Sequence, residues 1–511
     1  MDIPLREALQ HQTHPSLSLR GRAAALSGAS HAGTTKQSHP SSSNPSCPNA
    51  RLLSLSRRAL FAYKRNVRIS LALALSLLIL AGCAEIPLPE WLGTLVPPVA
   101  TTETTPASPG TPAPTGDLNP TPAGGETLTS PTPPPTGGVT TLRLWVPPQF
   151  FPGDDNRANI LLQDRLDEFT QRRTGVRIEV RAKAVSGPGG LLDSLTAANA
   201  AATLALPDLI LLPRPELETA ALKGLLYPLD GLTNSLEESD WYPFAQQLAH
   251  LQDTTFGLPF AGDSLVLLYR PAEIEVPLDD WEAVLGLEQP LVFPAADEGA
   301  LFTLAQYLAT GAPIQDEEGR PVLDTNALAE VLSFYQAAET AEIMPFWLTQ
   351  FSTDEQAWEA YQENRANLVV TWITRYLSEL PGDTAAAPIP VPPGDPFTLA
   401  NGWVWAISSP EVERHPLSVE LAEFLTQDEF LSEWTASAGY LPPRASALAG
   451  WSNPVLRDLV SSIVQNAQVL PPTDVLAVLS PILHKATIEV LKEQANPGAA
   501  AQEAGESLPN P

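Results

Sequence analysis

Cysteine is scarce in this sequence. The 511 residues include only Cys47 and Cys83, and both precede the long region after residue 138 in which apolar residues recur regularly. That region therefore has no thiol for a disulfide bond, a thiolate metal site or a cysteine nucleophile. Histidine is also rare there, because His250, His415 and His484 are scattered without the spacing of metal ligands. We expect neither a metal nor another cofactor.

Positive charge is the second deficit. The sequence has 29 Lys and Arg residues against 58 Asp and Glu residues. Residues 1–82, which we predict to be removed, hold 10 basic and 2 acidic residues, so that 19 and 56 remain and the formal charge is −37. Nucleic acids and anionic lipid surfaces are bound through positively charged faces. The composition therefore argues against both as partners.

The sequence also lacks a long apolar run at residues 69–82, where the apolar segment is short. It carries no charge but is shorter than the roughly 20 residues that a membrane-spanning helix needs. A basic stretch precedes it and small residues follow, which is the pattern of an export signal. Its end, Leu80-Ala81-Gly82-Cys83, resembles the lipobox of bacterial lipoproteins, whose cysteine is acylated and becomes the new N-terminus. We predict that Cys83 is a lipid anchor, the alternative being a buried apolar segment with an incidental thiol.

The next segment, residues 83–138, is predicted to be a tether. Between Pro97 and Gly138 there are 12 prolines and 11 threonines but no Lys or Arg. Such a composition cannot bury a core and favours an extended, solvated chain. At about 3.1 Å per residue it spans on the order of 100 Å, enough to hold a following domain away from a membrane.

The sequence pattern of residues 139–505 predicts an α/β domain. The pattern predicts strands at 139–146, 176–185 and 208–212, with helices at 155–173 and 191–202 between them. Alternating strands and helices imply a parallel sheet covered by helices. Helices dominate the C-terminal part, where we predict them at 418–426, 428–437, 454–467 and 473–494.

Seven ordered segments of this region resemble landmarks of one protein family. They are FTQRRTGVRIEV at 169–180, PDLILLPRPELETAALKGLLYPLD at 207–230, FGLPFAGDSLVLLYR at 256–270, ANLVVTW at 366–372, GWVWAISS at 402–409, AEFLTQDEFLSEW at 422–434 and GYLPPRASAL at 439–448. In order and spacing they resemble the extracellular solute-binding proteins of bacterial ABC importers, specifically the maltose-binding-like family.

The resemblance implies a two-lobed periplasmic-binding-protein-like fold of type II, with hinge strands and a helical C-terminal part. Lobe one would comprise about 139–268 and 378–445, and lobe two about 269–377 plus part of 446–505. A small solute, for which we expect a carbohydrate, would bind between the lobes and favour their closure. We therefore expect a monomer that is lipid-anchored outside the cytoplasm and delivers its solute to the transmembrane subunits of an ABC permease.

The candidate ligand contacts follow from strand ends and from the resemblance. Asp263 aligns with an acidic ligand contact of the family, and a carboxylate accepts hydrogen bonds from sugar hydroxyls or pairs with cations. Trp145 and Trp372 end strands, where ligands of open α/β sheets bind. Trp403 follows Gly402, a small residue that lets the backbone approach a ligand closely. Trp405 lies two residues further along the same strand, so its side chain points the same way as that of Trp403. The remaining candidates are Arg214, which could pair with an anion, and Tyr269. The alternatives are core packing for the tryptophans, hinge packing for Tyr269, a helix or turn cap for Asp263, and a solvated loop cation for Arg214.

Other functions stay open at this point. A secreted hydrolase such as a glycosidase would need a carboxylate pair, but GxSxG, HExxH and glycine-rich phosphate loops are absent from the sequence. A surface receptor for sensing or adhesion would look the same as an importer's binding protein. Leu212, Gly299 and Ser480 stand where maltose-type binders carry aromatic residues, which leaves a different carbohydrate or a small polar solute such as glycerol phosphate open.

Overall fold

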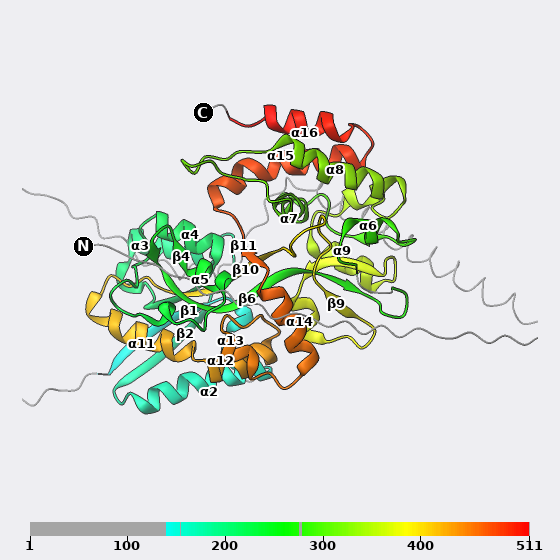
Figure 1. Cartoon of the computed structure of the whole chain (residues 1–511). Helices are drawn as coiled ribbons and strands as arrows, with labels where there is room; N and C mark the ends of the chain where they lie inside the picture. Colours follow the sequence, from blue (N-terminus) through cyan, green and yellow to red (C-terminus); the bar gives the residue numbers. More distant parts are fainter. Residues whose placement is uncertain (1–138, 154, 275–277, 510–511) are drawn as a thin grey trace, which may run out of the picture. The chain divides into compact units, whose positions relative to one another are not determined.

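The computed structural model describes residues 139–153, 155–274 and 278–509, and every structural statement below refers to these ranges (Figure 1). The predicted export signal, the lipid site at Cys83 and the tether all lie outside them. No helix within these ranges combines the length and the apolarity that crossing a membrane requires.

The strands form one large sheet and one small hairpin. The large sheet has the order β2-β1-β3-β10-β6-β8-β7, with β11 paired to β10 and β9 paired to β6, while β4 and β5 form the hairpin. The strands are β1 Thr140–Val146, β2 Val176–Ala182, β3 Leu209–Pro213, β4 His250–Leu251, β5 Thr254–Thr255, β6 Gly257–Tyr269, β7 Leu291–Val292, β8 Leu368–Trp372, β9 Ala385–Ala387, β10 Thr398–Ile407 and β11 Ala467–Val469.

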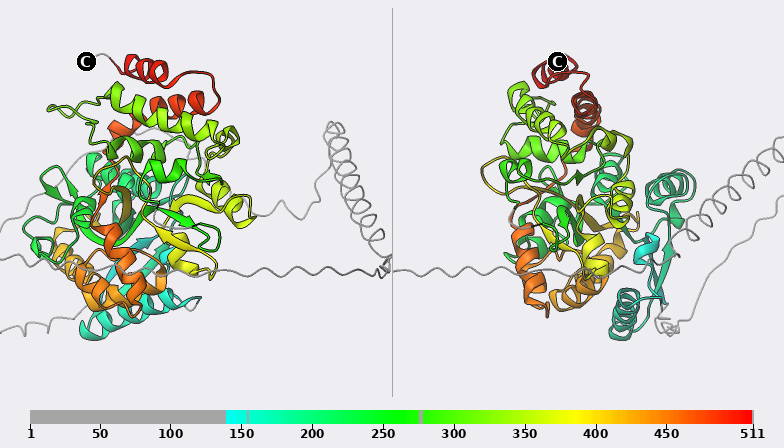
Figure 2. Two further views of the ribbon diagram at one scale, coloured as in Figure 1. Left: turned by 45° about the vertical axis from the view of Figure 1, so that its right-hand side comes forward. Right: turned by 90° about the vertical axis from the view of Figure 1, so that its right-hand side faces the viewer.

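The helices flank this sheet and fill the C-terminal part. They are α2 Arg157–Arg172, α3 Leu191–Ala201, α4 Arg214–Leu222, α5 Pro243–Ala249, α6 Trp281–Leu285, α7 Leu301–Ala309, α8 Thr325–Thr340, α9 Asp354–Gln362, α10 Thr374–Glu379, α11 His415–Leu425, α12 Asp428–Ala438, α13 Ala445–Ala449, α14 Pro454–Val464, α15 Thr473–Leu491 and α16 Pro497–Glu506. Short 3-10 turns include η2 Pro148–Phe150 and η5 Phe346–Gln350. The four predicted C-terminal helices are confirmed as α11, α12, α14 and α15. Helix α16 packs on α8 and α15 (Figure 2).

The N-terminal part confirms the predicted strand-helix-strand alternation. Strand β1 pairs in parallel with both β2 and β3. Helix α2 begins where the Asn156 side chain accepts a hydrogen bond from the amide of Asn159, and it buries Leu162, Leu166 and Phe169 on one face. Gly175, at φ +92°, then turns the chain into β2 in a conformation that disfavours other residues.

Strand β6 belongs to two parts of the sheet. Its first half runs antiparallel to β10, and its second half pairs with β8 and β9 (Figure 1). The β6–β10 register shifts between Trp403 and Val404, so that Phe260 is left over as a bulge. Proline has no amide hydrogen for the ladder, and Pro259 beside the bulge accounts for the interruption. The predicted lobe boundaries stay a prediction, although the sharing of β6 gives the sheet two distinguishable halves.

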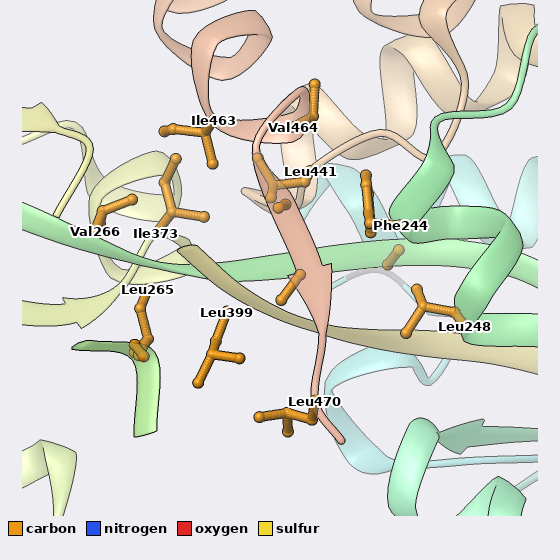
Figure 3. Packing of buried hydrophobic residues seen from close by; sticks show 14 of the residues in the cluster. Phe244, Leu248, Leu265, Val266, Ile373, Leu399, Leu441, Ile463, Val464 and Leu470 are labelled. Carbon is orange, nitrogen blue, oxygen red and sulfur yellow. The ribbon is translucent and has the colours of Figure 1, made fainter. Parts of the chain in front are cut away.

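Buried apolar side chains from both halves of the sheet pack around this junction. Figure 3 shows Val266 of β6, Leu399 of β10 and Ile463 of α14 among them, all at most 1% exposed. Packing there is tight, because a Cβ atom on Gly262 would lie 2.7 Å from the ring of Phe244. A larger residue at this position of β6 would force the neighbouring helix α5 away.

Candidate functional site

A cavity of about 330 Å³ lies beside the middle of β6. Strand β6 supplies one wall, the end of β8 and helix α10 supply a second, and the end of α12 supplies a third. Its lining residues are Asp263, Asp354, Trp372, Thr374, Arg375, Ser378, Ala438 and Tyr440. Two of the predicted ligand contacts, Asp263 and Trp372, therefore meet in one cavity although more than 100 residues separate them.

Asp263 is held by neutral donors. Its Oδ1 accepts hydrogen bonds from the amides of Ser264 at 2.9 Å and Thr374 at 3.2 Å, and its Oδ2 accepts one from the Thr374 hydroxyl at 2.8 Å. The surrounding protein replaces water around the carboxylate, and this desolvation raises the pKa of Asp263 to about 7, against the opposing effect of the three hydrogen bonds. Asp263 is thus a half-buried carboxyl group that is easily protonated near neutral pH.

The second carboxylate of the cavity is paired. Asp354, at the start of α9, accepts hydrogen bonds from the Thr371 hydroxyl and from Nε of Arg375, both at 2.6 Å. Arg375 also reaches Glu355 through Nη2 at 2.7 Å. Burial alone would lower the pKa of Arg375, but the two carboxylates outweigh it and raise that pKa. The guanidinium group is therefore already neutralised by carboxylates of α9.

Trp372 stands between two cavities. A smaller one of about 120 Å³ adjoins the first and shares Asp354 and Trp372 with it. Its other lining residues are Leu265, Pro294, Asp297, Leu301, Phe302 and Val370. The indole of Trp372 is half-buried and so has an exposed part from which it can contact a ligand. An aromatic face beside hydrogen-bonding groups suits a sugar ring, whose C–H face stacks while its hydroxyls bond.

The third wall depends on a glycine. Gly439 has φ +76°, and a Cβ atom there would lie 2.7 Å from the backbone nitrogen of Ser378. The chain after α12 can therefore approach α10 closely, which brings Tyr440 to the cavity. The ring of Tyr440 stacks on that of Trp434, with centroids 6.0 Å apart, and burial raises the pKa of its hydroxyl.

Trp145, Trp403 and Trp405 line neither cavity. Trp145 is 3% exposed, its Nε1 has no hydrogen-bond partner in the described ranges, and the Lys183 ammonium lies 4.9 Å from its ring centroid. This leaves no open ring face for stacking. Trp403 is half-buried, but the ring of Phe150 packs edge-on against it with centroids 5.0 Å apart. Trp405 is 1% exposed and lies in the core.

The two remaining candidates line neither cavity. Tyr269 ends β6 at 8% exposure, and burial raises its pKa. Arg214 begins α4, and its Nη1 donates a hydrogen bond to the Leu248 carbonyl at 3.4 Å. Desolvation lowers the pKa of Arg214, and Glu218 opposes this shift. As contacts to a ligand, both residues stay predictions.

Sequence reasoning did not single out several lining residues, namely Asp354, Thr374, Arg375, Ser378 and Tyr440. Tyr440 lies in the segment GYLPPRASAL, which drew attention as a family landmark, and Thr374 and Arg375 directly follow the predicted contact Trp372. A search for polar residues just after strand ends would have found Thr374 and Arg375, because β8 ends at Trp372. Within the described ranges, no group of three or more His, Cys, Asp or Glu side chains is placed to hold a metal ion.

Solved structures with the same fold include sugar-binding proteins. The MalE sugar-binding protein of Xanthomonas citri matches with a TM-score of 0.61 and 17% identity over 72% of this chain and 96% of its own. The cyclic α-maltosyl-1,6-maltose-binding protein of Arthrobacter globiformis gives a TM-score of 0.60, 16% identity and coverages of 72% and 98%. Maltose-bound MalE3 of T. maritima gives a TM-score of 0.56 and 18% identity, over 72% of this chain and 98% of its own. The predicted α/β fold of the two-lobed periplasmic-binding-protein type is confirmed.

Sequence comparison identifies the family. A search of curated proteins found no match to this chain. The family described as bacterial extracellular solute-binding protein, in contrast, matches residues 164–458, which is more than half of the chain and includes Asp263, Trp372 and Tyr440. Together with the fold, this match shows that the chain belongs to the bacterial extracellular solute-binding proteins, an extracytoplasmic family.

Proposed function

We propose that this protein binds a carbohydrate in the cavity between β6, α10 and α12 and delivers it to the permease of an ABC importer. The observation that carries the proposal is the meeting of the Trp372 indole with Asp263, Asp354 and Arg375 in one cavity. An aromatic face next to directional charged acceptors and donors suits a polyhydroxylated ring. The solved relatives that bind maltose and related sugars support the same ligand class.

Binding would couple to closure of the two lobes. The cavity takes Asp263 from β6, Trp372 from β8, and Tyr440 from the chain after α12, so a ligand touches elements on several sides at once. A ligand favours a closed form only by the difference between its affinities for the two forms. The strand β6, shared by both halves of the sheet, is the element through which such a movement would pass.

The anchor is part of the proposal. Acylation at Cys83 would hold the exported protein at the outer face of the membrane, and the Pro- and Thr-rich tether would give it reach. The support is the sequence pattern alone. Radiolabelled palmitate should be incorporated into the wild-type chain but not into the Cys83→Ala variant, and the variant should appear in the medium or periplasm. Equal labelling of both would contradict the assignment.

We infer that the cavity does not catalyse hydrolysis. Both Asp354 oxygens accept hydrogen bonds, from Thr371 and Arg375, so this carboxylate is not poised to attack or to activate water. A panel of chromogenic glycosides tests this inference, and release of the chromophore that disappears with Asp354→Asn would establish an enzyme instead.

The ligand test is a thermal-shift screen followed by calorimetry. The mature chain carrying Cys83→Ser is screened against mono- and oligosaccharides, polyols, sugar phosphates and amino acids. A ligand at 100 times its Kd adds about 2.7 kcal/mol to the folded state. Trp372→Ala should abolish the shift, whereas Trp347→Ala should keep it, because Trp347 is also half-buried but lines neither cavity. If both variants keep the ligand-induced rise in Tm, the binding site is not at Trp372. A rise in Tm with amino acids alone would refute the carbohydrate assignment.

A further inference from the structure

The charges that line the cavity do not balance. Two carboxylates, Asp263 and Asp354, face a single guanidinium group, that of Arg375. The neighbouring cavity adds Asp297, but the Gly299 and Leu301 amides donate to its two oxygens at 3.1 Å each, so both oxygens already bond the backbone. The imbalance therefore concerns Asp263, Asp354 and Arg375.

Asp263 is the carboxylate without a counter-charge. Arg375 gives its Nε to Asp354 and its Nη2 to Glu355, so the guanidinium group is committed to α9. The hydrogen-bond donors to Asp263 belong to Ser264 and Thr374 and are neutral. Within the described ranges, no Lys, Arg or His forms an ion pair with Asp263. A desolvated carboxylate is costly unless a positive charge compensates it or a proton neutralises it, and a cationic ligand would supply the positive charge.

The groups around Asp263 suit a cation that also carries a sugar ring. Trp372 and Tyr440 line the same cavity, and the faces of aromatic rings attract cations as well as C–H groups. The adjoining cavity, which shares Trp372 with the first, adds about 120 Å³ of space. Asp354 and Arg375 offer acceptors and donors for hydroxyls at the same wall. A neutral sugar would use these groups but would leave Asp263 to be neutralised by a proton and not by a ligand charge.

We propose that the ligand is an amine-bearing saccharide whose protonated amino group pairs with Asp263 while one of its rings stacks on Trp372. This inference rests on the proposed carbohydrate function and narrows its ligand class. Burial favours the protonated, neutral form of Asp263 in the empty site, as its pKa of about 7 indicates. An incoming ammonium group would favour the carboxylate, so binding near pH 7 should release protons from Asp263.

The test is a matched comparison by isothermal titration calorimetry at pH 7. The probes are three disaccharides with the same β-1,4 linkage: the glucosamine dimer, the N-acetylglucosamine dimer and the glucose dimer. Maltotriose is added as a neutral sugar of another linkage. All four are titrated into the mature chain carrying Cys83→Ser. We expect the glucosamine dimer to bind at least tenfold more tightly than either neutral dimer, with a preference that shrinks as salt rises.

The variant that isolates the charge is Asp263→Asn. The asparagine Oδ1 can keep both amide hydrogen bonds, and its Nδ2 can donate to the Thr374 hydroxyl, so the local structure survives. The preference for the amine should fall to within about threefold. Asp395→Asn, at an exposed position outside the cavity, should leave it unchanged.

The outcomes separate the two proposals. If neutral sugars bind as tightly as the glucosamine dimer, or if the preference survives in Asp263→Asn, the amine inference is overturned and the carbohydrate function stands. If none of the four probes binds while the thermal-shift screen finds a ligand that is not a sugar, both are overturned. Proton release can be followed by repeating the titration at pH 6 in buffers of different ionisation enthalpy, because both Asp263 and the sugar amine are then mostly protonated before binding. Its absence with a tightly bound amine would also refute pairing with Asp263.

Discussion

Replacing Asp263 by asparagine should stabilise the folded protein at neutral and alkaline pH. In the unfolded chain this carboxyl group has an ordinary pKa near 3.8, and in the folded protein burial raises the pKa to about 7. The folded state therefore binds the proton more tightly than the unfolded state does. Stability falls as the pH rises from about 4 to about 7 and is then constant, because above pH 7 the group is ionised in both states.

The magnitude follows from the shift. At 1.36 kcal/mol per unit, ionisation of Asp263 costs up to about 4 kcal/mol of folding free energy above pH 7. Asparagine removes this cost and keeps the hydrogen bonds. With an unfolding entropy of about 2.1 cal/mol/K per residue over about 370 folded residues, 4 kcal/mol corresponds to roughly 5 °C in Tm.

Differential scanning calorimetry of wild type and Asp263→Asn without ligand, at steps from pH 4 to pH 8, measures the effect. The two melting temperatures should coincide near pH 4 and separate as the pH rises, with the variant higher. The exposed Asp395→Asn serves as the matched control and should follow the wild type throughout. A constant difference across the range, or a variant that melts lower at pH 8, would show that Asp263 is not desolvated in the folded state.

Three further predictions concern the rest of the molecule. Gly439→Ala should lower stability by about 2 kcal/mol and weaken ligand binding, because a Cβ atom at φ +76° would meet the α10 backbone. The control Gly382→Ala, where a Cβ atom would have no atom within 4 Å, should change neither stability nor binding. Thermal melting and ligand titration of both variants measure these effects. Arg444→Met should cost about 3 kcal/mol in urea unfolding, because Arg444 is only 8% exposed and its guanidinium bonds Asp240 and lies 4.0 Å from the Trp241 ring centroid. A loss below 1 kcal/mol would contradict this. The formal charge of −37 beyond residue 82 should make Tm rise by a few degrees between 0.05 and 0.5 M NaCl, and a flat response would show that the charges do not repel appreciably.

The regular part of the fold was predictable from the sequence because its signals are local. The alternation in VRIEV and the spacing of Leu162, Leu166 and Phe169 each report one element and one buried face. The parallel pairing of β1 with β2 and β3 follows from the alternation of strands and helices. The bulge at Phe260 was not anticipated, although Pro259, which cannot donate to the sheet, was a usable signal.

The candidate site was predictable only in part, because it is assembled from distant segments. Asp263 and Trp372 were chosen from the resemblance and from strand ends, and both line one cavity. The Asp354–Arg375 pair depends on how α9 and α10 pack, which no local pattern reports. Trp145 also lies near the end of a strand, but neighbouring side chains cover it, because exposure at a strand end depends on tertiary packing. The roles of Asp263 and Trp372 in ligand binding stay predictions.

The sharing of β6 has a consequence for how the chain reaches its folded state. Its partner strands β8 and β10 begin at Leu368 and Thr398, far beyond its own end at Tyr269, so neither half of the strand can find its neighbours until most of the domain has been exported. During that interval an apolar strand with open edges is exposed outside the cytoplasm, where it can pair with other chains. We therefore expect slow, aggregation-sensitive refolding, in which the amides of β6 gain protection from hydrogen exchange only together with those of β10. Early protection of β6 alone would refute this order.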